Sequence, residues 1–200
     1  MKEIYKINTN SVEISINQAN MLDSYIKIYV NETTNKIVKE ESYNLSILSF
    51  IFYYITNTEN ELEVVEEQLK LCDYIAIVRI NIQGEYTIEN LNNYNRDKNV
   101  YIKERALIKD NKLLCIQGLK IDTDIPIFED TIKGYYQNDD FILEATYKED
   151  GSIDKLTYLC SDDEREFEYY DSSNFKDLQN QFEEDLSYYF TAEFLPKFNV

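Results

Sequence analysis

The residues with the clearest chemical potential form an acidic, tyrosine-bearing stretch between positions 158 and 171. Residues 161–171 contain six acids and one base. Carboxylates attract and pair with Lys or Arg of a partner, while tyrosine supplies contact area in protein interfaces. The stretch therefore predicts a surface that binds a basic protein. The candidate partner-binding residues are Asp162, Asp163, Glu164, Glu166, Glu168, Asp171, Tyr158 and Tyr170.

The same acids have a second interpretation. Charged side chains on an edge strand discourage pairing with the sheets of other molecules, so they can form a solvated edge without any partner. Further acids at positions 177 and 183–185 extend the negative stretch toward the C-terminal end. Both interpretations remain open from sequence alone.

Composition excludes most catalytic and metal sites. The chain has no histidine, which removes Ser-His-Asp and Cys-His catalysis and all His-containing metal sites. Its 4 glycines are too scattered for a nucleotide-binding loop, and its 3 cysteines contain no CxxC pair for zinc. Two chemistries are left open: a carboxylate pair of glycosidase type and a hard-metal site of Asp and Glu.

Neither of these two chemistries gains support from the sequence. The chain has no tryptophan to serve as a sugar platform. Acids between 122 and 130 resemble a calcium loop, but the glycine of such a loop is absent and Pro126 lies inside the segment. We therefore expect no enzymatic activity, no cofactor and no bound metal.

The formal net charge of −18 is unevenly distributed along the chain. Residues 1–121 carry 17 acids and 14 bases, whereas residues 122–200 carry 21 acids and 6 bases. Such a skew indicates a negative face. Direct binding to nucleic acid or to an anionic membrane is disfavoured, because phosphates would meet carboxylates.

The expected compartment is the cytoplasm of a low-GC bacterium. The three cysteines are an odd number without a disulfide-type spacing, which is typical of reduced thiols. The first residues lack the apolar core of a signal peptide. The longest apolar run, residues 47–55, is too short to span a bilayer.

The clearest folding signals lie between Phe141 and Phe190. Alternating apolar residues predict strands over 141–147, 153–160 and 165–170, and Asp150-Gly151 between the first two predicts a hairpin turn. An apolar stripe with helical spacing then predicts a helix over about 174–190; it consists of Phe175, Leu178, Phe182, Leu186 and Tyr189 or Phe190. A second helix, about 59–72, is predicted from the capping-box pattern that begins at Thr58.

The remaining segments are less distinctive. Residues 46–55 fit a central strand or a buried helix, with aromatic and β-branched content favouring a strand. Residues 100–109 and 113–121 predict a hairpin. The Asn-rich segment 90–99 predicts a long mobile loop, and 122–134, with Pro126, predicts a connecting loop.

Together these patterns predict an α+β fold, a mostly antiparallel sheet of meanders and hairpins with two main helices. We expect a single domain over residues 1–200, with a weak sub-boundary near 122. The expected function is that of an acidic cytosolic binding protein that neutralises a basic partner, as immunity-type inhibitors of bacterial toxins do. The alternatives are a nucleic-acid mimic that inhibits a DNA- or RNA-binding enzyme, and a structural or orphan domain without catalysis.

Overall fold

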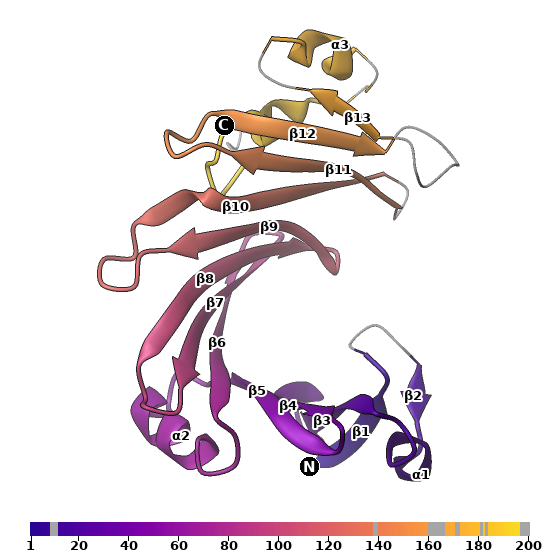
Figure 1. Cartoon of the computed structure of the whole chain (residues 1–200), viewed down its shortest axis with the longest axis vertical. Coiled ribbons are helices and arrows are strands. Elements are labelled where there is room, and N and C mark those ends of the chain that lie inside the picture. Colours follow the sequence, from indigo (N-terminus) through magenta and orange to yellow (C-terminus); the bar gives the residue numbers. More distant parts are fainter. Residues whose placement is uncertain are drawn as a thin grey trace. The chain divides into compact units, whose positions relative to one another are not determined.

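The fold is a single large, mostly antiparallel β-sheet with few helices (Figure 1). The structure is a computed structural model that describes residues 1–8, 12–137, 140–159, 167–170, 173–180, 182 and 184–196. Strands hold more than half of the described residues, and helices hold only a small part of them. The antiparallel sheet confirms the prediction, but the fold is largely β, so the predicted α+β class overstates the helical part.

The strands lie in the sheet almost in the order in which they occur along the chain (Figure 1). The order is β13-β12-β11-β10-β9-β8-β7-β6-β5-β4-β3-β1-β2, and it departs from chain order only at β1 and β2. The bounds are β1 Lys2–Lys6, β2 Glu13–Ile14, β3 Ser24–Asn31, β4 Lys36–Asn44, β5 Ile47–Tyr54, β6 Tyr74–Gln83, β7 Tyr86–Asn95, β8 Val100–Lys109, β9 Lys112–Leu119, β10 Pro126–Gln137, β11 Asp140–Tyr147, β12 Ile153–Leu159 and β13 Phe167–Tyr170.

The helices are short. They are α1 Ile16–Ala19, α2 Glu61–Gln68, α3 Phe175–Gln179 and the 3₁₀-helix η1 Leu186–Phe190. Strands β5 and β6 pair in parallel, and helix α2 lies in the connection between them. Two parallel strands need such a crossover, since a short turn can join only antiparallel strands. The pairs β3–β4, β4–β5 and β8–β9, and those from β9 to β13, are antiparallel.

The chain divides into two compact units. Unit 1 comprises residues 1–80 and 90–103, and unit 2 comprises residues 81–89 and 104–200. Strands β6, β7 and β8 therefore contribute residues to both units. Residue 122, where the charge of the sequence changes, lies inside unit 2.

The core of unit 1 lies between α2 and one face of β5 and β6. Its fully buried members include Ile51, Ile75 and Val65. Helix α2 begins where the Asn60 side chain accepts a hydrogen bond from the Leu62 amide at 3.0 Å. The predicted helix over 59–72 is thus confirmed in place, but it is shorter, and its cap is Asn60 instead of Thr58.

The core of unit 2 lies between one face of β10, β11 and β12 and the segment that follows β13. Leu143, Leu156, Leu178 and Leu186 are all fully buried in it. Register pairs Leu143 with Tyr158, so alternate residues of these strands share the covered face. The β11–β12 turn contains Gly151 at φ +81°, as the Asp-Gly hairpin signal predicts.

The single helix predicted over 174–190 is wrong. Helix α3 ends at Gln179, and η1 begins only at Leu186. The Gln179 side chain accepts a hydrogen bond from the Leu186 amide at 2.9 Å and donates one to the Glu184 carbonyl at 2.8 Å. These bonds satisfy backbone groups that a continuous helix would pair internally, so the chain turns while Leu178 and Leu186 still face the core.

Two predicted loops, 90–99 and 122–134, are strands over most of their length, and only 96–99 and 122–125 lie outside strands. The Asn-rich segment belongs to β7 as far as Asn95, because Asn92 and Tyr94 bind the Glu61 carboxylate and Asn93 is buried. The segment after residue 122 enters β10 at Pro126. Proline is tolerated there because the first residue of a strand does not have to donate a backbone hydrogen bond to the neighbouring strand.

Candidate functional site

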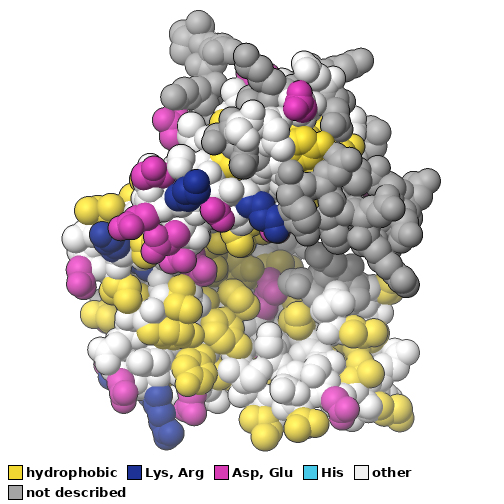
Figure 2. Space-filling view, turned by 45° about the horizontal axis from the view of Figure 1, so that its top comes forward, with side chains coloured by type: hydrophobic (Ala, Val, Ile, Leu, Met, Phe, Trp, Pro, Cys, Tyr) yellow, Lys and Arg dark blue, Asp and Glu magenta, His cyan; other side chains and the backbone are white. Residues whose placement is uncertain are grey.

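Most of the net negative charge of the chain belongs to unit 2. Unit 2 contains 25 acids and 10 bases, whereas unit 1 contains 13 acids and 10 bases. On the face drawn in Figure 2, Asp and Glu side chains lie among hydrophobic ones, and Lys and Arg are seen at fewer places. A partner attracted by charge would therefore be attracted mainly to unit 2.

The predicted acidic stretch is only partly described by the structure. Asp162, Asp163, Glu164, Glu166 and Asp171 lie outside the described residues. Glu168 belongs to β13, where its Cα pairs with that of Tyr158.

The two predicted tyrosines of this stretch are half-buried against the unit 2 core. Tyr158 packs its ring edge-on against Phe182, with ring centroids 5.5 Å apart. Tyr170 packs against the same core. Both side chains therefore contribute to packing, and their role in binding stays a prediction.

A different group of tyrosines in unit 2 lines a pocket of about 420 Å³, which we call the tyrosine pocket. One wall comes from the sheet and the β8–β9 turn, and the other comes from residues 184–196, which we call the C-terminal segment. The lining residues are Tyr86, Lys109, Asp110, Lys112, Leu114, Tyr135, Tyr136, Glu184, Asp185, Tyr188, Tyr189 and Pro196.

Buried polar side chains of the sheet hold the C-terminal segment in place. Lys133 is fully buried, and its ammonium donates to the carbonyls of Tyr188 at 2.7 Å and Thr191 at 2.8 Å. The same ammonium lies 3.5 Å from the centre of the Tyr188 ring. Burial lowers the pKa of Lys133 to about 7.

Gln117 is the second anchor, and it is also fully buried. Its amide nitrogen donates to the Ala192 carbonyl at 2.9 Å and to the Thr131 hydroxyl at 3.0 Å. Its oxygen accepts from the Arg105 guanidinium, which stacks 4.2 Å from the centre of the Phe194 ring. Because every polar atom of these anchors is used, the C-terminal segment has one defined position on its sheet.

The ends of η1 are fixed as well. Asp185 accepts from the backbone amide of Ser187 at 2.8 Å and so caps the helix. The Tyr147 hydroxyl donates to the Tyr189 carbonyl at 2.9 Å. These contacts place the side chains of Tyr188 and Tyr189 in the pocket wall.

The charged groups of the tyrosine pocket are arranged around its aromatic floor. The Tyr135 hydroxyl donates to Glu184 Oε2 at 3.0 Å, and burial together with this bond raises the pKa of Tyr135 to about 12. Lys109 pairs with Glu85 at 2.9 Å. The ammonium of Lys112 lies 5.9 Å from the centre of the Tyr136 ring. The pocket can thus hold an apolar stem, a cationic head against the rings, or both.

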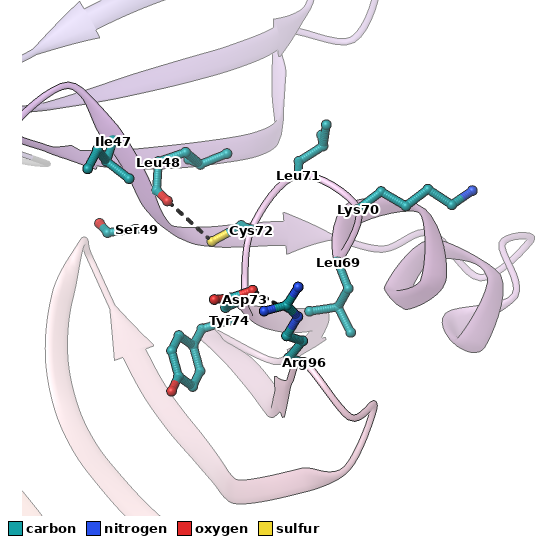
Figure 3. A pocket seen from close by; sticks show the side chains of 10 residues that line it. All are labelled: Ile47, Leu48, Ser49, Leu69, Lys70, Leu71, Cys72, Asp73, Tyr74 and Arg96. Atoms are coloured by element: carbon teal, nitrogen blue, oxygen red, sulfur yellow. Dashed lines mark hydrogen bonds and ion pairs between the residues drawn. The ribbon is translucent and has the colours of Figure 1, made fainter.

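A second hollow, of about 450 Å³, lies in unit 1 where the chain enters β5 and β6 (Figure 3). The buried Cys72 thiol donates to the Leu48 carbonyl at 3.8 Å, and Arg96 pairs with Asp73 at 3.5 Å. Ile47 and Leu71 line the hollow with largely exposed side chains. Lys70 also lines the hollow, whose lining therefore mixes apolar side chains with charged ones of both signs.

One buried carboxyl group, that of Glu104, has an altered protonation equilibrium. Burial, reinforced by the nearby charge of Asp130, raises the pKa of Glu104. Neither residue lines the tyrosine pocket or the hollow of unit 1. Within the described part of the chain, no group of three or more Cys, Asp or Glu could hold a metal ion.

The sequence signal for the tyrosine pocket is weak but real. Tyr135-Tyr136 and Tyr188-Tyr189 are doublets, and in the structure all four residues line the pocket. Periodicity assigns one member of each doublet to the core and cannot show that the two doublets meet.

Comparison of the chain with protein-family models and with curated proteins finds no match. Of the helices in the described residues, none is both long enough and apolar enough to cross a membrane.

Proposed function

We propose that the protein binds a basic protein through unit 2 and inhibits it, in the manner of immunity proteins that neutralise bacterial toxins. The observation that supports this proposal most is the tyrosine pocket, which combines five tyrosines with Glu184 and Asp185 in the unit that carries the excess acid. Aromatic residues beside carboxylates are the composition of an interface that captures Arg or Lys.

The two features act at different stages of binding. The net charge of unit 2 steers a cationic partner and raises the association rate by roughly ten- to a thousandfold at low salt. The pocket holds the partner once it has arrived, because a partly desolvated cation between rings and a carboxylate dissociates slowly. The bound partner is inhibited if the Arg or Lys side chains held by unit 2 are the ones with which the partner binds its own anionic substrate.

The test is affinity capture from the native strain with the wild-type protein and three variants, followed by titration of the captured partner. Glu184→Lys reverses a pocket charge. Glu149→Lys is the matched control, an exposed acid of unit 2 in the β11–β12 turn. A triple reversal of Asp162, Asp163 and Glu164 tests the predicted acidic stretch separately.

The proposal predicts a basic partner whose activity is inhibited by the wild type and by the control. Glu184→Lys should weaken its binding at least tenfold, because one favourable contact becomes a repulsive one. The proposal would be contradicted by partners that are not basic, or by an affinity that changes neither with salt concentration nor on charge reversal. A partner that DNA or RNA displaces would identify the nucleic-acid-mimic alternative.

A further inference from the structure

We infer that the tyrosine pocket receives one arginine side chain, an inference that rests on the proposed function and names the group recognised. The pocket volume of about 420 Å³ lies in the range of sites that enclose a small ligand, roughly 300–1,000 Å³. It is therefore large enough for a single long side chain and too small for a folded element.

The aromatic floor suits a planar cation. Tyr86, Tyr135 and Tyr189 are more than nine-tenths buried and hold fixed positions, while Tyr136 and Tyr188 are half-buried and supply the accessible ring surface of the pocket. Tyr135 and Tyr189 meet edge to face, with centroids 5.7 Å apart. A guanidinium stacks on such rings and is more weakly hydrated than an ammonium, so its transfer into the pocket costs less free energy.

The chain itself shows this arrangement at a neighbouring place in unit 2. The Arg105 guanidinium carbon lies 4.2 Å from the centre of the Phe194 ring, and two N–H groups of this guanidinium point at one oxygen of Gln117, at 3.0 and 2.5 Å. The tyrosine pocket offers the same two kinds of group, aromatic rings and an acceptor oxygen, and its acceptor is the Glu184 carboxylate instead of an amide oxygen.

Glu184 is oriented for such a contact. The Tyr135 hydroxyl donates to Oε2 and so holds the carboxylate at the pocket rim, where the residue is exposed. An ionised carboxylate has about four acceptor positions, of which this bond uses one. The remaining positions can accept the parallel N–H groups of a guanidinium.

The two lysines of the rim limit the affinity and provide an internal control. Lys109 pairs with Glu85, and the Lys112 ammonium lies 5.9 Å from the centre of the Tyr136 ring, where its charge would oppose the stacking of a second cation. Removing the charge of Lys112 should therefore strengthen arginine binding, whereas removing the charge of Glu184 should weaken it. A merely structural effect of either substitution would not give opposite signs.

The experiment uses three peptides, Ac-Gly-Ser-X-Ser-Gly-NH₂, in which X is arginine, lysine or neutral citrulline. Binding to the full-length protein is followed by tyrosine fluorescence, since the chain contains no tryptophan, and by chemical-shift changes. We expect the arginine peptide to bind at least tenfold more tightly than the citrulline peptide, and more tightly than the lysine peptide. Glu184→Gln should remove most of this preference, and Lys112→Gln should raise arginine affinity two- to fivefold.

Equal affinity for arginine and citrulline, or an unchanged preference in Glu184→Gln that melts like the wild type, would overturn the inference. If the preference is absent while a basic partner is still captured and inhibited, the pocket inference fails and the proposed function stands. If the arginine preference is present but the captured partners are not basic, the proposed function fails.

Discussion

Replacing Gln117 by leucine should loosen the C-terminal segment and with it one wall of the tyrosine pocket. Leucine has a similar volume, so the change removes hydrogen bonds without opening a large cavity. It deprives the Ala192 carbonyl of its donor, a loss of about 1–3 kcal/mol for a buried acceptor. It also deprives the half-buried Arg105 guanidinium of its acceptor, a further loss of about 1.5–3 kcal/mol.

These two losses predict a decrease in the free energy of unfolding of about 2.5–6 kcal/mol, or roughly 5–20 °C in melting temperature for a chain of this length. Urea denaturation measures it, with Gln83→Leu as a control because Gln83 is exposed in the same unit. Amide exchange should show that the Ala192 amide, bonded to the Gly151 carbonyl, loses more protection than amides of β11. A decrease below about 1 kcal/mol with unchanged Ala192 protection would refute the anchoring role.

Three further perturbations have defined outcomes. Because burial lowers the pKa of Lys133 to about 7 from its ordinary 10.5, the unfolded state binds more protons above pH 7. Stability should therefore rise between pH 7 and 9 by up to about 1.4 kcal/mol per pH unit, and Lys133→Met should flatten this slope in pH-dependent urea titrations. Glu61→Ala breaks contacts to Arg79, Asn92 and Tyr94 and should cost about 2–4 kcal/mol in chemical denaturation, whereas Glu63→Ala in the same turn should cost under about 0.5. Gly151→Ala should lower the melting temperature through a loss of about 1–2 kcal/mol, because φ is +81° and the new Cβ would lie 3.2 Å from the Phe128 ring; an unchanged melting curve would show that the turn relaxes.

Local patterns predicted the hairpins well, because hairpins depend on neighbouring residues. The alternation of β11 and β12 and the glycine between them determine that pair. The same reasoning failed for β7 and β10. Asn92 and Tyr94 gain their partner, Glu61, from an element about thirty residues away. Thr131 and Lys133 are polar in type yet fully buried, since other segments satisfy them.

The helix predicted over 174–190 shows how one pattern can arise from two structures. Its apolar stripe correctly identified Leu178, Leu186 and Tyr189 as buried. A short helix, a turn held by Gln179 and a 3₁₀-helix bury the same residues without one continuous helix. Side-chain bonding to the backbone decides between these structures, and periodicity does not report it.

The types of residue in the candidate site could be predicted from the sequence, but the place of the site in the fold could not. Excess acid combined with tyrosine was evident in the sequence, and unit 2 contains that excess. The tyrosine pocket, however, joins residues near 86, 110, 135 and 188, which only the pairing of the strands and the docking of the C-terminal segment bring together. Tyr158 and Tyr170 instead pack against the core.

The most direct test of the account is the salt dependence of binding between the captured partner and unit 2, measured on the full chain. Calorimetric titration should be made at several salt concentrations with the wild type, Glu184→Lys and Glu149→Lys. The account predicts tight binding that weakens as salt rises, a loss of at least tenfold for Glu184→Lys and little change for Glu149→Lys. Equal affinities for all three proteins across the salt series would contradict it.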